Sequence, residues 1–418
     1  MVCREQRKLR KYEYMDKILV LNSGSTTVKF QLFQMDKNIH RVVAKGMVER
    51  IGLNGSKITI KADDKHILSE LIPISDHKEA IKAILDYLSK EHLKNINELS
   101  AVGHRMGHGG EYFDHSVIID EDVMAKIYDT LPLLPLHGPA FVHGVEAMKE
   151  LLPNVIQVAT FDSAFHQSVE KSSYIYALPK EYYAKERIRR YGFHGTSHHY
   201  VAKKTAEILG HDGKFICCHL GGGASVTAIN HGKSVETTMG YTPSSGLLMA
   251  TRAGDMDPYI PLHIMKTQHK TADEVNAILN KESGLYGLSC GHSDMRDIEE
   301  QALNGNKECA LAIDVFVYNL VKTIGSYVAV LGGIDALIFT AGIGENSPLV
   351  RQKVCEKLRY LGIELSSDKN AQSPVPLEIS SVQSRVKVMV IPANEELMIA
   401  TETFDILEEL AENEPLAV

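Results

Sequence analysis

The 418-residue chain has 45 Lys and Arg residues against 53 Asp and Glu residues, which gives a formal net charge of −8. This acidic balance argues against nucleic-acid binding as the main function, because such surfaces are basic. Hydrophobic residues make up 44% of the chain and charged residues 23%, a composition typical of globular proteins and not of disordered ones. The length exceeds one ordinary core, so two domains are expected.

Cysteine usage and the N-terminus predict the compartment. The six cysteines form no CxxC pair, and so few in a long chain favour a reducing compartment over a disulfide framework. Residues 1–14 are charged and lack the apolar segment of a signal peptide, and no run of 18 apolar residues predicts a membrane-spanning helix. We expect a cytoplasmic protein without a membrane partner. Its first 14 residues are either a disordered extension, which we prefer, or the product of an upstream start codon.

Strands and helices alternate along the chain, which predicts an α/β architecture. Residues 18–37 combine an apolar strand, a Gly/Ser/Thr turn and a second strand, and residues 215–233 repeat this layout. Gly24 and Gly221 in the two turns are 197 positions apart, close to half the chain, so we expect a duplicated domain with both turns facing a cleft. Glycine turns expose backbone N–H groups that can cradle phosphate, although either turn alone could be a plain hairpin.

Later elements are predicted from apolar spacing and glycine positions. After a cap at residues 75–76, apolar residues recur at helical spacing and predict a core-facing helix. A strand at 336–341 leads into a glycine-rich turn at 342–348 and a helix that stops at Gly362, the usual order for nucleotide binding, although a lone GxG is weak evidence. The last helix, from Asn394 onward, is expected to pack on the first domain.

Two arginines lie in glycine-rich segments, Arg105 within residues 103–111 and Arg252 within residues 240–258. We expect both segments to be loops. Phosphoryl transfer needs cations and hydrogen-bond donors around the transferred group, and the planar guanidinium fork suits carboxylate and phosphate oxygens. An isolated arginine is more often part of a surface ion pair, but two in such segments are candidates for a phosphoryl-transfer site.

His194 and His198 have a spacing of four residues, which could resemble a zinc-binding pair. HExxH is absent and no Cys or acidic third ligand is close in sequence, so we expect His194 to donate to a phosphoryl oxygen instead. Asp162 follows the apolar run 155–161, and it either orients an arginine, contacts Mg²⁺ and water, or only caps a turn.

Three further side chains could reach phosphate or metal. Asn22 and Lys29 flank the first glycine turn with an amide oxygen and an ammonium group. Glu395 opens the last helix, where an acid also stabilises the helix dipole without any ligand.

Ten ordered motifs between residues 18 and 400 resemble those of the acetate kinase family: NSGSTTVKF, GHRMGHGG, LHGPA, FDSAFH, RRYGFHGTSHH, HLGGGAS, TMGYTPSSGLLMATRAGDMDP, SGLYGLS with SDMRD, FTAGIGENS and IPANEEL. The resemblance implies duplicated actin/hexokinase/Hsp70-like (ribonuclease H-like) domains with an interdomain cleft. It also implies a homodimer that phosphorylates acetate with ATP and Mg²⁺, which Mn²⁺ could replace. The expected domains are residues 15–164 with 396–418, and residues 165–395 for nucleotide binding and dimerisation.

The resemblance also implies roles for individual residues. Catalysis would involve Asp162, His194 and Arg252, with Asn22 and Glu395 as metal ligands. Substrate contacts are implied for Arg105, Gly107, His137, Phe193 and Pro243. Nucleotide contacts are implied for Lys29, His219, Leu220, Gly221, Gly222, Gly223, Asp294, Met295, Arg296, Gly342, Ile343, Gly344, Glu345 and Asn346. The substrate carboxylate is ionised at pH 7 and needs no strong base for in-line attack, so Asp162 serves equally well as the partner of an arginine.

Three glycines depart from the family's usual residues. Gly222 replaces an asparagine and leaves only backbone donors near the phosphates, which predicts weaker ATP affinity. Gly138 also replaces an asparagine. Gly107 stands where acetate-using relatives have valine and propionate kinases have alanine, so it could make room for one more methylene, worth about 0.8 kcal/mol of burial. Either propionate is then used at least as well as acetate, or Met106 refills the space.

Two other functions belong to the same fold or site. An actin- or Hsp70-like protein would use the nucleotide to drive a conformational change and needs no acyl site, so Arg105, His194 and Arg252 disfavour it. Use of pyrophosphate in place of ATP is disfavoured by the intact GIGENS motif.

Overall fold

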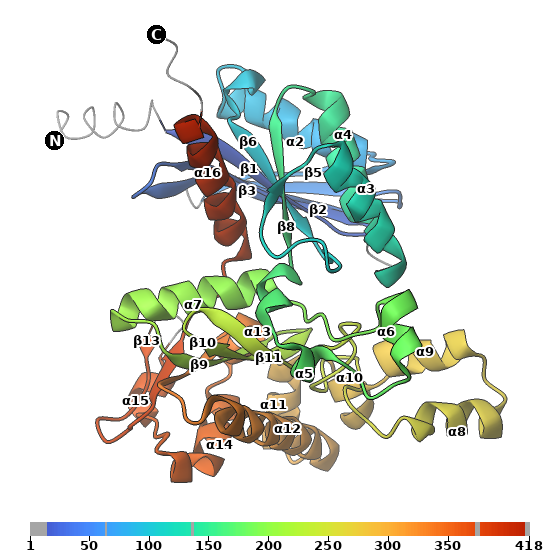
Figure 1. Cartoon of the computed structure of the whole chain (residues 1–418), viewed down its shortest axis with the longest axis vertical. Coiled ribbons are helices and arrows are strands. Elements are labelled where there is room, and N and C mark those ends of the chain that lie inside the picture. The colour runs from blue at the N-terminus through green and yellow to red at the C-terminus, as the bar shows by residue number, and fades with distance from the viewer. Residues whose placement is uncertain (1–14, 63–64, 135–137, 373–376, 414–418) are drawn as a thin grey trace. The chain divides into compact units, whose positions relative to one another are not determined.

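The computed structural model describes residues 15–62, 65–134, 138–372 and 377–413. The predictions for residues 1–14 and for His137 lie outside this part of the chain. Two compact units make up the fold (Figure 1). Unit 1 combines the residues up to Ala164 with those from Glu395 onward, and unit 2 runs from Phe165 to Asn394.

Unit 1 is built on an eight-stranded sheet in the order β5-β4-β3-β2-β1-β6-β8-β7. β1 (Asp16–Ser23) pairs antiparallel with β2 (Thr27–Met35) and parallel with β6 (Ala101–Met106), which in turn pairs parallel with β8 (Ile156–Phe161). The remaining strands are β3 (His40–Glu49), β4 (Lys57–Ala62), β5 (Lys65–Leu71) and β7 (Val117–Ile118).

Unit 2 is built on a six-stranded sheet in the order β11-β10-β9-β12-β14-β13. β9 (Lys214–Leu220) pairs antiparallel with β10 (Ala224–Asn230) and parallel with β12 (Ala336–Thr340), which pairs parallel with β14 (Lys387–Val390). β11 (Lys233–Thr237) and β13 (Leu377–Glu378) form the two edges.

The two sheets share one topology. The sequence β3-β2-β1-β6-β8-β7 in unit 1 matches β11-β10-β9-β12-β14-β13 in unit 2, in strand order and in the direction of every pair just described. The glycine turns of the two predicted repeats join β1 to β2 and β9 to β10. The predicted duplicated α/β fold is therefore confirmed.

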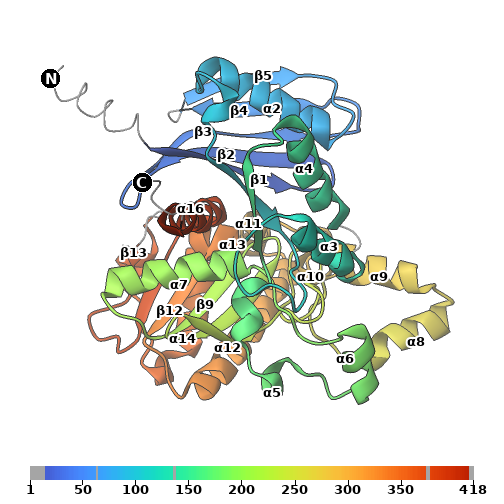
Figure 2. The ribbon, with the colours of Figure 1, turned by 45° about the horizontal axis from the view of Figure 1, so that its top comes forward.

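Helices cover both faces of the unit 1 sheet. α2 (His77–Glu91) and α4 (Gly138–Leu151) pack together on one face, and α2 has the predicted Asp76 cap and buries the predicted apolar stripe (Ala80, Ile81, Ile84, Leu85, Leu88). α16 (Glu395–Asn413) packs on β6 and β1 from the other face (Figure 2), as predicted for the last helix. A Cβ at Gly103 would lie 2.6 Å from Thr403 Oγ1, so this close approach requires glycine.

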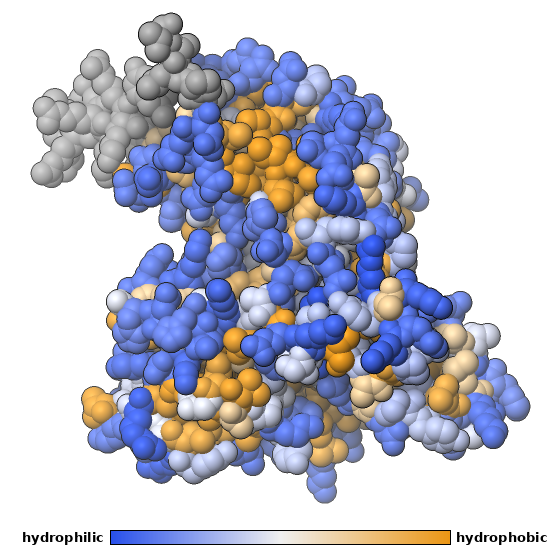
Figure 3. Space-filling view, in the orientation of Figure 1, coloured by the Kyte–Doolittle hydropathy of each residue, from blue (hydrophilic) through white to orange (hydrophobic). Residues whose placement is uncertain are grey.

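The helices of unit 2 flank its sheet in the same way. α7 (Gly195–Leu209) packs against β9, and α12 (Lys307–Leu331) packs against β9 and β10 on the opposite face (Figure 1). Apolar side chains of both sheets are buried, while hydrophilic side chains dominate the face shown in Figure 3.

The remaining helical segments connect these layers. They are η1 (Ile96–Glu98), α3 (Glu121–Thr130), η2 (Leu131–Leu133), η3 (Ala164–Ser168), α5 (Lys171–Tyr174), α6 (Lys180–Glu186), α8 (Tyr259–Gln268), α9 (Ala272–Lys281), α10 (Gly284–Leu288), α11 (Met295–Leu303), α13 (Ala341–Asn346), α14 (Pro348–Lys357), η4 (Arg359–Leu361) and α15 (Ser367–Asn370).

α12 is the one helix of the described chain that is long and apolar enough to cross a membrane by length and composition alone. Its apolar stretch contains Asp314 and Lys322, so a count of uninterrupted apolar residues does not detect it. Buried core helices pass the same test, and one side of α12 is buried against the sheet.

Two local predictions were wrong. Arg105 lies in strand β6 and not in a loop, because residues 101–106 pair with both β1 and β8. Residues 342–346 are not an open turn but part of the short helix α13, which begins directly after β12 with Ala341 in the left-handed region at φ 63°. Glycine-rich sequence signals turns well, but it does not exclude a helix that starts at a strand end.

A pH prediction follows from His104, which is buried in β6 with Nε2 2.9 Å from Gln157 Oε1. Burial lowers the pKa of His104 from its usual 6.5 to about 4, partly opposed by the bond to Gln157. Below pH 6.5 the His104 side chain is therefore protonated in the unfolded chain but remains neutral in the folded chain until the pH approaches 4. Stability from this group is complete above pH 6.5 and is lost as the pH falls towards 4, by about 3 kcal/mol in total.

Urea unfolding between pH 7 and 4.5 measures this effect. His104→Gln should make the free energy of unfolding less dependent on pH, by about 1.4 kcal/mol per pH unit. His211→Gln, at an exposed position, is the matched control. Equal pH slopes for wild type and His104→Gln would contradict the assignment.

Candidate active site

An ion pair between Arg105 and Asp162 forms the centre of the charged groups in unit 1. Arg105 is the last but one residue of β6 and Asp162 directly follows β8, so parallel pairing of the two strands brings them to the same edge. The guanidinium NH2 lies 2.6 Å from Asp162 Oδ2, and Nε lies 3.1 Å from the same oxygen. Burial opposes the charge of Arg105, but the carboxylates of Asp162 and Glu395 outweigh it and raise the pKa of the guanidinium. Arg105 is thus a fixed cation.

Asn22, Lys29 and Glu395 surround this pair. Asn22 and Lys29 face each other in the β1–β2 register. Asn22 Oδ1 lies 3.5 Å from NH1 of Arg105, and Glu395 Oε2 lies 3.7 Å from its Nε. Burial raises the pKa of Glu395, while Arg105 and Lys29 act in the opposite direction. An amide oxygen and a carboxylate are hard oxygen donors of the kind that bind Mg²⁺ together with phosphate oxygens, so these residues fit a phosphate-bound magnesium ion.

The space beside Gly107 is filled, which favours the second of the two alternatives, refilling by other side chains, over room for a larger acyl group. A Cβ at Gly107 would lie 2.5 Å from Leu134 Cδ2 and 2.8 Å from Phe141 Cε2. The cavity that these residues line with Met106 has a volume of about 10 Å³, which is room for about one water molecule. Leu134 and Phe141, and not Met106 alone, occupy the missing side chain's space.

Gly138 also borders this cavity. A Cβ there would lie 2.7 Å from Leu131 Cδ2, so leucine side chains replace the bulk that both glycines lack. The sequence shows that both positions are glycine, but it does not show that Leu131 and Leu134 fill the space beside them. These leucines belong to a segment with no regular spacing of apolar residues.

His194 lies at the start of α7 in unit 2 in a strained conformation. Its φ of 58° and ψ of 19° fall in the left-handed region, which is unfavourable for residues other than glycine. Such strain persists where the surroundings hold it, and it clusters at functional sites.

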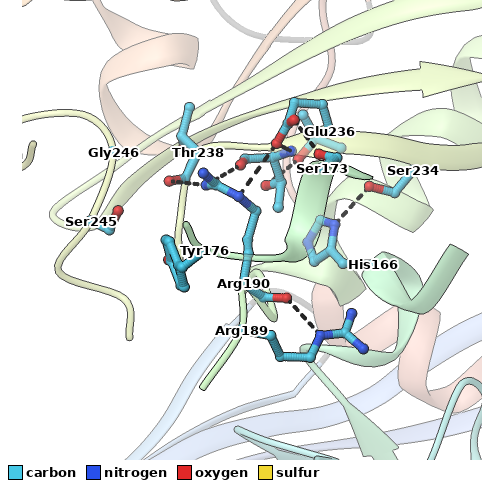
Figure 4. Close-up of polar contacts among 12 residues, drawn as sticks. His166, Ser173, Tyr176, Arg189, Arg190, Ser234, Glu236, Thr238, Ser245 and Gly246 are labelled. Atoms are coloured by element: carbon cyan, nitrogen blue, oxygen red, sulfur yellow. Dashed lines mark hydrogen bonds and ion pairs between the residues drawn. The ribbon is translucent and has the colours of Figure 1, made fainter. Parts of the chain in front are cut away.

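Arg190 anchors the segment that leads to His194, and Figure 4 shows its polar contacts. Its NH1 donates to the carbonyl oxygens of Thr237 at 2.8 Å and Thr238 at 3.1 Å, and its Nε lies 3.5 Å from Glu236 Oε1. The backbone N–H of Tyr191 donates to Gly240 O at 3.1 Å. These bonds tie residues 190–191 to the end of β11.

His166 holds the next residues. Its Nε2 lies 3.0 Å from the carbonyl oxygen of Phe193. Its Nδ1 lies 2.9 Å from Ser234 Oγ, a contact drawn in Figure 4. A carbonyl only accepts, so Nε2 of His166 carries a proton and donates to Phe193. Phe193 is itself buried, and His194 follows it directly.

His194 and Arg252 meet beside the second glycine turn. A Cβ at Gly223 would lie 3.2 Å from Nε2 of His194 and 3.7 Å from NH1 of Arg252. The same NH1 donates to Pro243 O at 3.1 Å, which holds the guanidinium in its loop. Burial lowers the pKa of Arg252, although an arginine remains charged. Two side-chain nitrogens thus converge on the glycine turn, within which the Gly221 N–H donates to Gly223 O at 2.9 Å.

His194 is partly exposed and contacts two buried histidines, His198 and His219. Its Nδ1 lies 2.9 Å from Ser225 Oγ, and Nε2 of His198 lies 2.8 Å from the same oxygen. The ring of His219 stacks on that of His194, with centroids 4.2 Å apart. Within the described chain, no group of three or more His, Cys, Asp and Glu side chains could hold a metal ion.

A cavity of 480 Å³ in unit 2 lies next to this turn. It is lined by parts of all three predicted nucleotide segments: Gly221, Gly222, Asp294, Met295, Arg296, Gly342, Ile343 and Asn346. Arg296 pairs with Asp294 at 2.6 Å, and its hydrogen bonds lower the pKa of Asp294 to about 2. Sequence reasoning missed Ser293, Glu299 and Ser347, which line the same cavity.

Other predicted nucleotide residues do not line this cavity. Leu220 is fully buried in β9, Gly344 is buried in α13, and Glu345 accepts a hydrogen bond from the backbone N–H of Ala393 at 2.9 Å. His219 and Gly223 lie with His194 as described above. Lys29 belongs to unit 1. The contiguous motifs therefore mix cavity-lining residues with residues that support them.

Arg351 supports α13 from within the core. It is 1% exposed, and its guanidinium donates to the carbonyl oxygens of Gly344, Glu345 and Asn370, each at 2.8 Å. These bonds satisfy carbonyl groups at the end of a short helix whose first turn borders the cavity. The sequence analysis did not single out Arg351, so this anchor was not predicted.

Residues 17–401 match the Acetokinase family. An acetate kinase of Thermotoga petrophila is 50% identical over 404 residues, which cover 94% of this chain and 99% of the relative. The crystal structure of Porphyromonas gingivalis acetate kinase superposes with a TM-score of 0.90 at 41% identity, covering 94% of this chain and all of that one. A propionate kinase from Francisella tularensis superposes with a TM-score of 0.87 at 40% identity, covering 93% and 99% of the two chains.

Proposed function

This chain belongs to the acetokinase family, and we propose that it is an acetate kinase, which transfers the γ-phosphoryl group of ATP reversibly to acetate. The observation that carries the proposal is a matched set of groups. Unit 1 holds the fixed cation Arg105 beside oxygen donors, and unit 2 holds His194 and Arg252 next to a glycine-lined cavity. A carboxylate, a nucleotide and a transferred phosphoryl group would each find partners of the right chemistry.

Arg105 binds the acetate carboxylate in this proposal, and Asp162 keeps its guanidinium in place. The carboxylate is ionised at neutral pH, so one of its oxygens attacks the γ-phosphorus in line without a base. Asp162 already bonds two nitrogens of Arg105, which supports an orienting role over proton transfer.

The nucleotide occupies the cavity in unit 2, with its phosphates near the glycine turn at 221–223. Nε2 of His194 and the guanidinium of Arg252 then donate to the equatorial oxygens, where negative charge is spread in the transition state. Asn22 and Glu395 would hold Mg²⁺, which neutralises phosphate charge when bound. Lys29, beside Asn22 in the register of β1 and β2, adds a further positive charge.

Acetate fits this site better than larger acids. If the acyl group points towards Gly107, it meets the side chains of Leu134 and Phe141, which fill the space that a valine would otherwise occupy. A propionate kinase is among the similar structures, but the filled cavity favours the shorter acid.

Acyl-phosphate formation, trapped as the hydroxamate, tests the function directly. With ATP and Mg²⁺, the order of catalytic efficiency should be acetate, then propionate, then butyrate. Leu134→Ala should raise the ratio of propionate to acetate efficiency about 4-fold, the effect of burying one methylene. Propionate efficiency equal to that of acetate in the wild type would contradict the acyl assignment. ATP binding without any acyl phosphate would favour a nucleotide-driven conformational protein instead.

Gly222 gives a prediction for nucleotide affinity. No atom lies within 4 Å of a Cβ built at this position, which borders the cavity, so a side chain is accommodated. Gly222→Asn adds a carboxamide that can donate to phosphate and should lower the Kd for ATP about 2- to 10-fold, the strength of one hydrogen bond. Gly222→Ala adds bulk without a donor and serves as the control. An unchanged or higher Kd for Gly222→Asn would show that the amide does not reach the phosphates.

A homodimer is part of the proposal, with α12 as the contact. Leu311 and Tyr318 are 55% and 63% exposed and lie two turns apart, so they share one side of the helix. Exposed apolar side chains in a row on a long helix are typical of a protein contact.

Light scattering after size-exclusion chromatography tests the dimer. Tyr318→Glu combined with Leu311→Glu should shift the mass from two chains to one, because each charge would be buried in the contact. Val382→Glu, at an apolar residue that is 93% exposed elsewhere in unit 2, should leave the mass unchanged. A wild-type protein with the mass of one chain would refute the proposal.

A further inference from the structure

Two histidines, His194 and His198, share one serine hydroxyl in unit 2. Ser225 Oγ lies 2.9 Å from Nδ1 of His194 and 2.8 Å from Nε2 of His198. Ser225 and His198 are fully buried, whereas His194 is partly exposed. Ser225 lies opposite His219 in the register of β9 and β10, so the sheet fixes its position.

The single proton of the Ser225 hydroxyl couples the protonation of the two histidine rings. A serine hydroxyl has one proton, so it donates to one ring nitrogen and accepts from the other. Two arrangements are possible when both rings are neutral. In the first, His198 donates through Nε2 and the hydroxyl donates to Nδ1 of His194. In the second, both bonds run in the opposite direction and His194 donates through Nδ1.

The surroundings of His198 decide between the two arrangements. Burial, followed by the nearby rings of His166 and His219, lowers the pKa of His198 well below its usual value, so the ring is neutral. Its Nδ1 is buried and has no hydrogen-bond partner. In the second arrangement this nitrogen would carry an unpaired N–H, whereas in the first it is a bare acceptor. Buried N–H groups without a partner are the rarer of the two, so the first arrangement is favoured.

We propose that His198 and Ser225 are positioning residues that hold His194 in the tautomer with its proton on Nε2. The chain of bonds runs from His198 Nε2–H to Ser225 Oγ, and from the Ser225 hydroxyl to Nδ1 of His194. This leaves the N–H of His194 on the atom beside Gly223 and Arg252. The opposite tautomer would turn a lone pair towards the same place and repel phosphoryl oxygens.

The catalytic consequence of this inference rests on the proposed function, whereas the tautomer of His194 does not depend on it. Stacking with His219, whose Nδ1 lies 2.8 Å from Ser197 Oγ, keeps the His194 ring in its plane but leaves the tautomer undetermined. His166 provides an internal contrast. Its tautomer is set by the carbonyl of Phe193, so its serine partner, Ser234 (Figure 4), is not needed for that purpose.

Histidine ¹⁵N NMR of the wild-type protein is the primary test. The His194 signal, assigned by its loss in His194→Gln, should show a protonated Nε2 and a bare Nδ1 near neutral pH. A protonated Nδ1 with a bare Nε2 would overturn the proposal. This measurement needs no activity and no folded variant of His198 or Ser225.

Acyl-phosphate kinetics of variants supply the second test. Ser225→Ala and His198→Phe should each lower kcat about 3- to 10-fold with little change in KM, the loss of one hydrogen bond in the chain. His198→Gln places a donor where Nε2 was and should restore most of the loss, whereas His198→Asn is too short. Ser234→Ala is the matched control and should stay within about twofold of wild type. If the kcat of His198→Phe equalled or exceeded that of His198→Gln, packing alone would explain the contribution of His198 to kcat.

A double variant separates the positioning role of Ser225 from the proposed catalytic role of His194. In His194→Gln the carboxamide nitrogen always carries protons, so adding Ser225→Ala should have no further effect on kcat. A full additional loss would overturn the positioning role. If His194→Gln alone kept the wild-type kcat, the proposed function of His194 would fail, while the NMR result would still decide the tautomer.

Discussion

Parallel pairing of β1, β6 and β8 decides where unit 1 concentrates its charge. These strands end at the same edge of the sheet, and Asn22, Arg105 and Asp162 lie at or just beyond their ends. A bond from the backbone N–H of Asp162 to Met106 O, 2.9 Å long, extends the pairing past the last strand residues. A cation, a carboxylate and an amide are thereby held together without any loop of their own.

Unit 2 repeats the sheet but uses its edge differently. The equivalent strands β9 and β12 end at a glycine turn and at the start of α13. This edge of the sheet therefore presents backbone groups beside a cavity, whereas the same edge in unit 1 presents charged side chains. Its charged and polar side chains come from loops and from the strained residue that directly precedes α7. One duplicated architecture thus provides a charged cluster in one copy and a cavity in the other.

Much of this was predictable from sequence, and the reasons are local. The α2 stripe has helical spacing and the glycine turns repeat at half the chain length, so the fold followed from patterns within single segments. The filled space beside Gly107 did not, because Leu134 is distant in sequence and its packing depends on three dimensions. Likewise, Ser225 and His198 lie inside motifs, but the motifs do not reveal that α7 packs on the sheet so that one hydroxyl lies between two histidine rings.

The path of the chain between units has a consequence for synthesis. α16 follows the last strand of unit 2 but completes the core of unit 1, where it covers β1 and β6. Gly103 and Thr403 touch across 300 positions, so one face of the first sheet stays uncovered until residues 395–413 have left the ribosome. The second unit can therefore fold to completion before the first, while the apolar sheet face that α16 covers stays exposed until the last helix has been made.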